Sequence, residues 1–365
     1  MGAASHRGIL PTISMASTPA DSSDLLAVPG HRLGAINQLL AVLTPGRQVV
    51  LSTHINSDGD GCGSEAGFAR ILAGAGIRSR IVNPTPWPAL FDFLLGSDVD
   101  DQTARGADAL ADADVMVVLD IGDVRRLGVL ADAVRALTIP KLVIDHHLPG
   151  DEPPGPTVFS DTTACATGEL VFDLAITAGW AISREAATAL YTALLTDTGG
   201  FRFSNTSPRC HAIAGYLLSL GIDPEEMYRR VYASVPLGRL HLLRDALATL
   251  EVDPEYGISW ISVPAGALER YGIKSEDLDG IAEHPRSIAG TRLAIFFRDL
   301  GHGKVKVSFR STGGVDVNQL ARQFGGGGHA KAAGALVAGS LDAARAQVID
   351  AARAAIGPRS VAGAS

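Results

Sequence analysis

The sequence RQVVLSTHINSDGDGCGS, residues 47–64, decides the fold class of this chain. Its first half is a continuous apolar run, which is typical of a strand buried on both faces of a parallel sheet. Its second half is rich in glycine and aspartate, which favour a loop leading from a strand into a helix. We therefore predict a strand over residues 47–54 and a helix over about residues 63–75.

The same alternation of apolar runs and amphipathic stretches continues downstream. Further strands are expected over residues 78–83, 114–122 and 141–147, with helical stretches between them. Alternating strands and helices predict an α/β domain, in which helices flank a parallel sheet with right-handed crossovers. After about residue 251 three strand-like segments follow one another, and a turn at Gly301–Gly303 joins the last two. A second, smaller α/β domain is therefore expected.

Length and composition bound the organisation of the chain. Its 365 residues, 46% of them hydrophobic, exceed one ordinary core and suit two. The net charge of −8 disfavours the binding of long duplex nucleic acid but is compatible with a small anionic substrate. Three widely spaced cysteines and the lack of a long apolar run favour a cytoplasmic protein without a membrane segment. We expect a disordered tail, a first domain, a helical linker, a second domain and a short tail, over residues 1–32, 33–222, 223–250, 251–358 and 359–365.

Histidine and aspartate gather at the carboxyl ends of three expected strands, where open parallel sheets bind their ligands. These residues are His54, Asp58, Asp60, Asp120, Asp145, His146 and His147. Imidazole and carboxylate together suit Mn²⁺, Fe²⁺, Co²⁺ or Zn²⁺, and a bridging carboxylate can hold two ions ~3.5–4 Å apart. Gly59, Gly61 and Gly63 are expected to let the loop turn tightly. Taken singly, Asp60 could be only a helix cap, and a lone aspartate at a strand end, such as Asp120, is more often a turn or cap residue. The coincidence of three such clusters at strand ends nevertheless favours a metal site.

Five motifs of the sequence resemble the motifs of a known protein family. HINSDGDGCGS, VVLDIGD, VIDHHLPG and LLTDTGG resemble the four motifs of the DHH phosphoesterases, and FGGGGHAKAAGA resembles the glycine-rich motif of the associated DHHA1 domain. Their order and spacing are most similar to the NrnA-type branch, the nano-RNase and pAp-phosphatase enzymes. The resemblance covers about residues 35–357. It implies a DHH domain with a parallel sheet, linked by a helix to a smaller α/β DHHA1 domain with a mixed sheet.

The resemblance also implies a role for each motif residue. Two divalent ions, Mn²⁺ first, with Mg²⁺ or Co²⁺ as alternatives, would share a bridging Asp120, and a hydroxide between them would attack the phosphorus. His147 would touch the scissile phosphate, and Asp145 would orient its neighbours. The remaining ligands would be His54 and Asp58 for one ion, and Asp60, His146 and Asp197 for the other. Asp197 has no strand signal, because it follows a helical run.

Substrate contacts are expected in the second domain. Gly326, Gly327 and Gly328 offer backbone N–H groups as an anion nest, although a glycine run also suits a flexible linker. Arg310 ends an expected strand and can make a bidentate phosphate contact, or it is a solvated surface charge. The resemblance raises Arg310, His329 and Asn318 to substrate contacts.

These features predict a hydrolase that acts on ester bonds of very short oligoribonucleotides and of pAp, as a phosphodiesterase and a bisphosphate nucleotidase. Cyclic di-AMP is a further candidate substrate. The resemblance also implies a homodimer. The alternatives are a long-strand single-stranded exonuclease, an inorganic pyrophosphatase and a non-catalytic nucleotide sensor. The acidic charge disfavours the first, the glycine run disfavours the second, and the complete set of six ligands disfavours the third.

Overall fold

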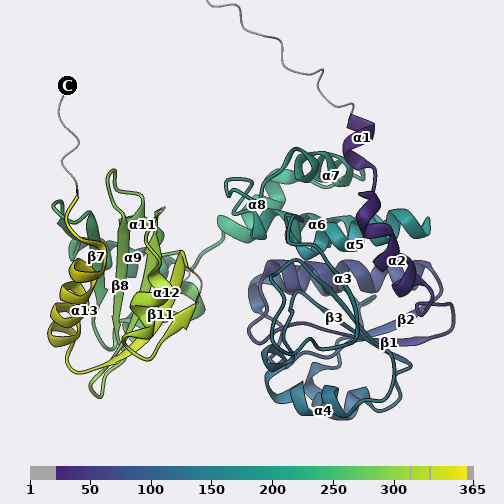
Figure 1. The fold of residues 1–365 in the computed structure, drawn as a ribbon, viewed down its shortest axis with the longest axis horizontal. Helices are drawn as coiled ribbons and strands as arrows, with labels where there is room; N and C mark the ends of the chain where they lie inside the picture. The colour runs from purple at the N-terminus through teal and green to yellow at the C-terminus, as the bar shows by residue number, and fades with distance from the viewer. Residues whose placement is uncertain (1–21, 279, 313, 329, 360–365) are drawn as a thin grey trace, which may run out of the picture. The chain divides into compact units, whose positions relative to one another are not determined.

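The computed structural model describes residues 22–359 except residues 279, 313 and 329 (Figure 1). The chain forms two compact units that divide between Ala233 and Ser234, within the segment predicted as a linker. Residues 22–32, assigned to a tail from the sequence, contain α1 (Ser22–Leu26) and the 3-10 helix η1 (Gly30–Arg32). The Arg32 guanidinium is buried because it pairs with three carboxylates, those of Asp161, Glu169 and Asp173.

The first unit contains the predicted parallel sheet. Its strands lie in the order β2-β1-β3-β4-β5, and every neighbouring pair is parallel. They span β1 (Gln48–Ser52), β2 (Arg78–Ile81), β3 (Val115–Leu119), β4 (Lys141–Asp145) and β5 (Thr157–Ser160). Since the chain passes from β2 to the far side of β1, the strand order reverses between β1 and β3. Ligands of open α/β sheets bind at this kind of switch point.

Helices cover both faces of this sheet (Figure 1). Successive residues of the strands point to opposite faces, so Val49 and Leu51 enter one core while Val50 enters another. The larger core lies under α2 (Leu33–Leu40), α3 (Gly59–Gly74), α5 (Thr167–Ala178), α6 (Arg184–Asp197) and α7 (Pro208–Ser219). The smaller core lies under the 3-10 helix η4 (Val124–Leu130) and α4 (Ala131–Ala136).

Two segments of the first unit depart from the expected helices. Helix α3 begins at Gly59 rather than near residue 63, because the Asp58 side chain accepts hydrogen bonds from the Asp60 and Gly61 amides as an N-cap. The segment at residues 89–94 is the 3-10 helix η2 (Ala89–Leu94). The unit ends with α8 (Pro224–Tyr232).

The second unit contains a mixed sheet of the order β10-β11-β9-β8-β7-β6, in which only the β7–β8 pair is parallel among the described strands. The predicted turn is confirmed, since Gly301 and Gly303 have positive φ values in the connection between β8 and β9. The strands are β6 (Glu251–Asp253), β7 (Ile258–Val263), β8 (Leu293–Asp299), β9 (Lys304–Ser311), β10 (Gly327–Gly328) and β11 (Ala332–Ala338).

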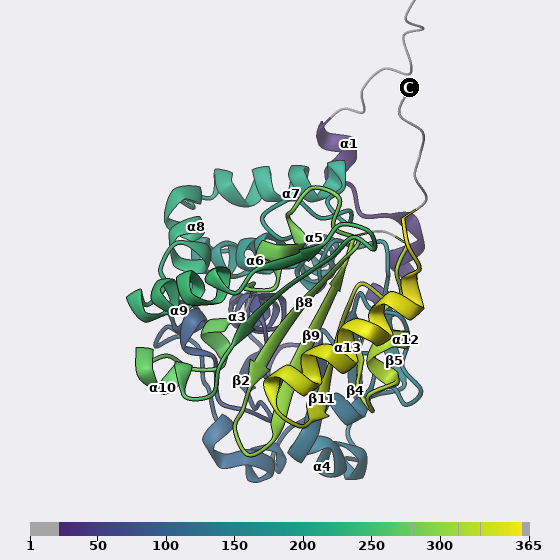
Figure 2. The same cartoon turned by 90° about the vertical axis from the view of Figure 1, so that its left-hand side faces the viewer.

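Two sets of helices pack on the two faces of the mixed sheet. One face carries α12 (Val317–Arg322) and α13 (Leu341–Ile356), and Figure 2 shows α13 lying along β8, β9 and β11. The other face packs against α9 (Leu237–Ala248), α10 (Ala267–Tyr271) and α11 (Glu283–Arg286). Among the described residues, none of the helices combines the length and the apolar character that a membrane crossing requires.

Candidate metal centre

The predicted ligands meet at the carboxyl edge of the parallel sheet, beside its switch point. His54 lies two residues beyond β1, Asp120 directly follows β3, and His146 directly follows β4. Helix α3 contributes its N-cap Asp58 and its first-turn residue Asp60. The last predicted ligand, Asp197, is the final residue of α6. The structure therefore brings together all six residues that were expected to hold metal.

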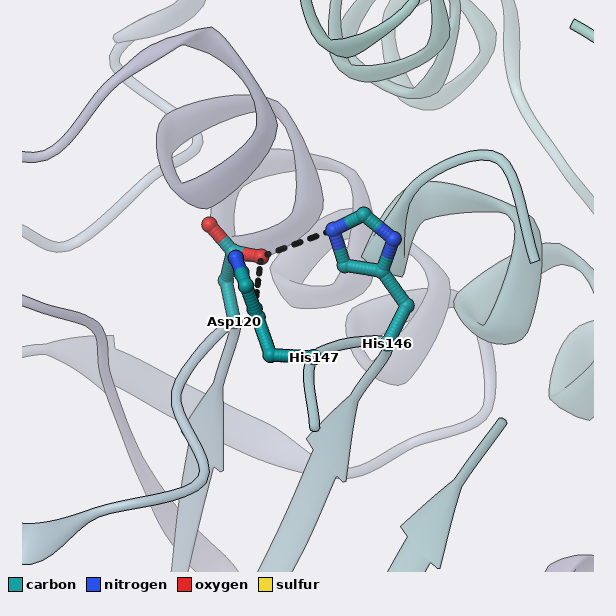
Figure 3. Close-up of side chains that lie close together, drawn as sticks. All are labelled: Asp120, His146 and His147. Atoms are coloured by element: carbon teal, nitrogen blue, oxygen red, sulfur yellow. Dashed lines mark ion pairs between the residues drawn. The ribbon is translucent and has the colours of Figure 1, made fainter. Parts of the chain in front are cut away.

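Among the described residues, their donor atoms form two groups, each within 4.8 Å, and a third group of Asp120, His146 and His147 links the two. His54, Asp58 and Asp120 form one group, and the His54 Nε2 atom lies 3.4 Å from Asp120 Oδ2. In a second group, His146 Nε2 lies 3.5 Å from Asp60 Oδ2 and 3.7 Å from Asp197 Oδ2. Asp120 Oδ1 lies 3.7 Å from the same His146 Nε2 atom, as Figure 3 shows. The two oxygens of Asp120 therefore face different donor groups.

Both histidines present a nitrogen that fits a metal ion. The Nε2 atoms of His54 and His146 are buried and have no hydrogen-bond partner among the described residues. In each ring the other nitrogen lies beside a backbone carbonyl: His54 Nδ1 is 2.9 Å from the Ile55 oxygen, and His146 Nδ1 is 3.2 Å from the Ala164 oxygen. A ring that donates through Nδ1 keeps a lone pair on Nε2, the usual arrangement of a metal-ligating histidine. The donor set therefore suits divalent ions.

The electrostatics of the cluster reflect crowded carboxylates. Burial raises the pKa of Asp60 well above its usual range, and repulsion from Asp120 and Asp197 adds to this effect. Burial also raises the pKa of Asp197 to about 6. Burial lowers the pKa of His54, but its contacts with Asp120 and Asp58 outweigh this and raise the pKa to about 10. Divalent cations would relieve the repulsion, and their binding would release the His54 proton.

His147 and Asp145 form a pair beside the ligands. The His147 Nδ1 atom lies 2.8 Å from Asp145 Oδ1, and the His147 side chain is 35% exposed. Burial lowers the pKa of His147, but the hydrogen bond to Asp145 outweighs it and raises the pKa. Because Asp145 engages Nδ1, the Nε2 atom is the one that can reach a substrate. The expectation that Asp145 orients its neighbour agrees with this contact.

The glycines after His54 have a different role from the one expected. Gly59, Gly61 and Gly63 lie in α3, and none of them has a positive φ value, so they do not make a tight loop. A Cβ atom on Gly59 would overlap the Thr196 side chain, and one on Gly63 would overlap the Ala189 carbonyl oxygen. Gly59 and Gly63 let α3 approach α6 closely, which brings Asp60 near Asp197, whereas Gly61 lies against Thr53.

Sequence reasoning missed the residues that hold the ligands in place. The Asn205 amide donates to Asp197 Oδ2 at 3.1 Å and to the Cys165 carbonyl oxygen at 2.9 Å. The Thr167 hydroxyl donates to Asp120 Oδ1 at 2.9 Å. Nothing around Asn205 in the sequence points to this role. For Thr167 one signal existed, because the helix that it opens follows an alanine, which offers no capping side chain.

Most of the predicted substrate-binding residues of the second unit lie around one end of β9. Arg310 pairs with Ala332 of β11, and its Nε atom lies 3.5 Å from Glu283 Oε1. Asn318 lies in the first turn of α12, beside Gly327. His329 lies outside the described residues.

The glycine run offers fewer backbone donors than expected. Gly327 and Gly328 form the short strand β10 against β11. The Gly326 amide donates to the Ala321 carbonyl oxygen. The Gly326 donor of the expected anion nest is therefore already engaged, and the substrate-binding role of the run stays a prediction.

Comparison with known proteins places both units in one family. The family model "DHH family, N-terminal domain" matches residues 48–194, and the model "DHHA1 domain" matches residues 258–356. The bifunctional oligoribonuclease and PAP phosphatase NrnA of Thermus thermophilus is 33% identical over 84% of this chain and 89% of its own length. The protein of the same name from Bacillus subtilis is 29% identical over 79% and 89%.

A solved structure supports the same relationship. An exopolyphosphatase-related protein from Bacteroides fragilis superposes with a TM-score of 0.81 at 30% identity, over 88% of this chain and 95% of that protein. The parallel and mixed sheets described above are thus the sheets of a DHH region and a DHHA1 region. The chain belongs to the DHH phosphoesterase family, with a DHHA1 domain after its DHH domain.

Proposed function

We propose that this protein is a two-metal phosphoesterase that hydrolyses very short oligoribonucleotides to 5′-mononucleotides and pAp to AMP and phosphate. One observation carries the proposal: the two oxygens of Asp120 face the histidines of two donor groups, and each of these histidines has a buried nitrogen without a partner among the described residues. The relatives from T. thermophilus and B. subtilis are named for the same two activities, which supports this choice of substrates.

The ligand roles follow the two donor groups. Asp120 would serve both ions because its oxygens face different histidines. When bound, two divalent ions lower the pKa of a coordinated water and offset negative charge on the phosphate. Mn²⁺ fits a set of imidazoles and carboxylates, and Co²⁺ and Mg²⁺ are the alternatives. The remaining ligands are His54 and Asp58 for one ion, and Asp60, His146 and Asp197 for the other.

Other residues of this chain would bind and orient the substrate. His147, held by Asp145, would donate a hydrogen bond from its Nε2–H group to a non-bridging phosphate oxygen. In the second unit, Arg310 would hold a terminal phosphate, and Asn318, Gly326–Gly328 and His329 would contribute further contacts. The predicted homodimer and the cytoplasmic location stay predictions.

The site is tested by the substitution Asp120→Asn, which keeps the shape of the side chain and removes its charge. We expect Mn²⁺-dependent hydrolysis of pApA and pAp to fall by more than about 100-fold, because both ions lose a carboxylate ligand. Asp114→Asn is the matched control, since Asp114 precedes β3 while Asp120 follows it. Circular dichroism should remain native for both variants. Retained turnover in Asp120→Asn would contradict the site.

A substrate panel distinguishes the proposal from its alternatives. Initial rates with Mn²⁺ are compared for pApA, pAp, cyclic di-AMP, a long single-stranded RNA and pyrophosphate. Preference for pApA and pAp is the expected result. Faster hydrolysis of the long RNA or of pyrophosphate would favour the exonuclease or pyrophosphatase alternative, and binding without turnover would favour a sensor. Comparable turnover of cyclic di-AMP would extend the substrate range.

A further inference from the structure

Thr167, the first residue of α5, lies between two of the proposed metal ligands. The residue is fully buried. Its amide nitrogen donates to Asp60 Oδ2 at 2.7 Å, and its hydroxyl donates to Asp120 Oδ1 at 2.9 Å. The hydroxyl must be the donor, because an ionised carboxylate only accepts hydrogen bonds. One residue thus contacts a ligand of one donor group and the carboxylate whose two oxygens face the histidines of both groups.

The backbone of α5 fixes Asp60. The helix has alanine at its N-cap position, Ala166, so its own sequence supplies no side-chain acceptor for the first amides. The Asp60 carboxylate of α3 takes that place: Oδ2 accepts from the Thr167 amide, and Oδ1 accepts from the Gly168 amide at 3.0 Å. The positive end of the helix favours a carboxylate there. Two bonds to one rigid helix orient Asp60 Oδ2 toward His146 Nε2.

The side chain of Thr167 fixes Asp120. If Asp120 served two ions, the rotation of its carboxylate would affect both of them, because this rotation sets the directions in which its oxygens can donate. Asp120 Oδ2 faces His54, and Oδ1 faces His146. The Thr167 hydroxyl occupies a lone pair of Oδ1, and this bond opposes rotation of the carboxylate.

We propose that Thr167 is a positioning residue. It sets the geometry of the two-ion site by fixing the orientations of the Asp60 and Asp120 carboxylates relative to one another. The inference rests on the proposed function and deepens it. Thr167 contacts neither substrate nor ion, and it acts only through the two carboxylates. Its amide bond to Asp60 survives any substitution except proline, whereas its bond to Asp120 depends on the hydroxyl.

The test compares Thr167→Val, which replaces the hydroxyl with a methyl group of similar size, with Thr167→Ser, which keeps the hydroxyl. Calorimetric titration with Mn²⁺ measures how many ions bind and how tightly. Electron paramagnetic resonance of the loaded protein reports whether the two ions are magnetically coupled. We expect the weaker Mn²⁺ site of Thr167→Val to lose affinity by about 10–100-fold, with loss of the coupled signal. Thr167→Ser should behave like the natural protein.

Two further measurements distinguish a positioning role of Thr167 from a general loss of folding in the Thr167→Val protein. The thermal midpoint of the metal-free Thr167→Val protein should stay close to that of the natural protein. At saturating Mn²⁺, its kcat for pAp should fall while KM stays within about 3-fold, because transition-state interactions are lost rather than substrate binding. Two coupled ions of natural affinity in Thr167→Val would overturn the inference, as would a Thr167→Ser protein as impaired as Thr167→Val. If the natural protein binds two coupled ions but hydrolyses no substrate of the panel, the proposed function fails and the positioning role stands.

Discussion

At the residue scale, two acidic side chains of α3 differ in how their burial is compensated. Asp60 accepts three hydrogen bonds, from Ser64, Thr167 and Gly168, and its Oδ2 atom also faces His146. Glu65 is equally buried, but only its Oε2 atom accepts a bond, from Asn83 at 2.8 Å. Its Oε1 atom has no partner within the part of the chain that the structure describes. Burial raises the pKa of Glu65 to about 8, so this side chain carries a proton at neutral pH.

The protonated Glu65 predicts how stability depends on pH. Its folded pKa of about 8 lies above its ordinary value of 4.5, so between these values the unfolded chain ionises while the folded chain keeps its proton. The free energy of unfolding therefore falls as pH rises through this window, by at most about 1.4 kcal/mol per pH unit from this group. Glu65→Gln should remove that slope and stabilise the metal-free protein near neutral pH.

Urea unfolding of the metal-free proteins at several pH values between 5 and 8 measures this difference. The exposed acid Glu185 provides a control, because Glu185→Gln should leave the slope unchanged. Parallel pH profiles for the natural protein and Glu65→Gln would show that Glu65 is ionised in the folded state.

Single residues of the site differ in how well the sequence alone could predict them. His54, Asp120 and His146 were identifiable because each follows an apolar run that had to be a strand. Asp197 required the family resemblance, since a helix end gives no such signal. Asn205 could not be assigned, because its role depends on where separate elements meet in space rather than on spacing along the chain. For Thr167 the uncapped start of its helix was a signal, but the sequence does not show which carboxylates lie there.

At the scale of elements, the contact between α3 and α6 determines whether the second donor group can form. Asp60 lies in the first turn of α3, and Asp197 ends α6. Gly59, Gly63 and Gly67 follow one another at four-residue intervals, so they share a face of α3, and each lies against α6. The sequence predicted both helices but not this contact, because glycine next to aspartate is typical of a loop. The short strand β5 was also missed, since its four residues give little periodicity.

Gly63→Ala tests the importance of this close approach. The new Cβ atom would overlap the Ala189 carbonyl oxygen and crowd Ala193, so α6 must move away. We expect a loss of about 1–3 kcal/mol in the free energy of unfolding, as for an overpacked core. Mn²⁺ affinity should fall as well, because Asp197 moves with α6. Thermal unfolding and calorimetric titration measure the two effects.

Gly74→Ala in the same helix is the matched control. A Cβ atom at Gly74 would meet no described heavy atom within 4 Å. Alanine should therefore be neutral there or stabilise the helix by up to about 1 kcal/mol, in keeping with its helix propensity. If Gly63→Ala were as stable as Gly74→Ala and bound Mn²⁺ equally well, close packing of α3 on α6 would not be what positions Asp197.

At the scale of the whole molecule, the chain divides its predicted chemistry between two units. All six proposed metal ligands lie within residues 1–233, whereas Arg310 and Asn318 lie within residues 234–365. Each unit has its own sheet with an apolar core on either face, which is what an independently folding domain requires. The sequence predicted this division because its strand pattern changes near residue 251, although compactness alone places the boundary between Ala233 and Ser234.

This division predicts that metal binding and substrate turnover can be separated. A fragment of residues 1–233 retains every proposed ligand and both faces of the parallel sheet, so it should bind two Mn²⁺ ions as tightly as the full chain. It lacks the proposed grip on the far phosphate, so kcat/KM for pAp and pApA should fall by about 100-fold. Circular dichroism melting verifies that the fragment is folded, and calorimetry and initial rates give the two comparisons. A folded fragment with the full kcat/KM would show that the second unit does not hold the substrate, and one that binds no metal would show that the centre needs more than the six ligands.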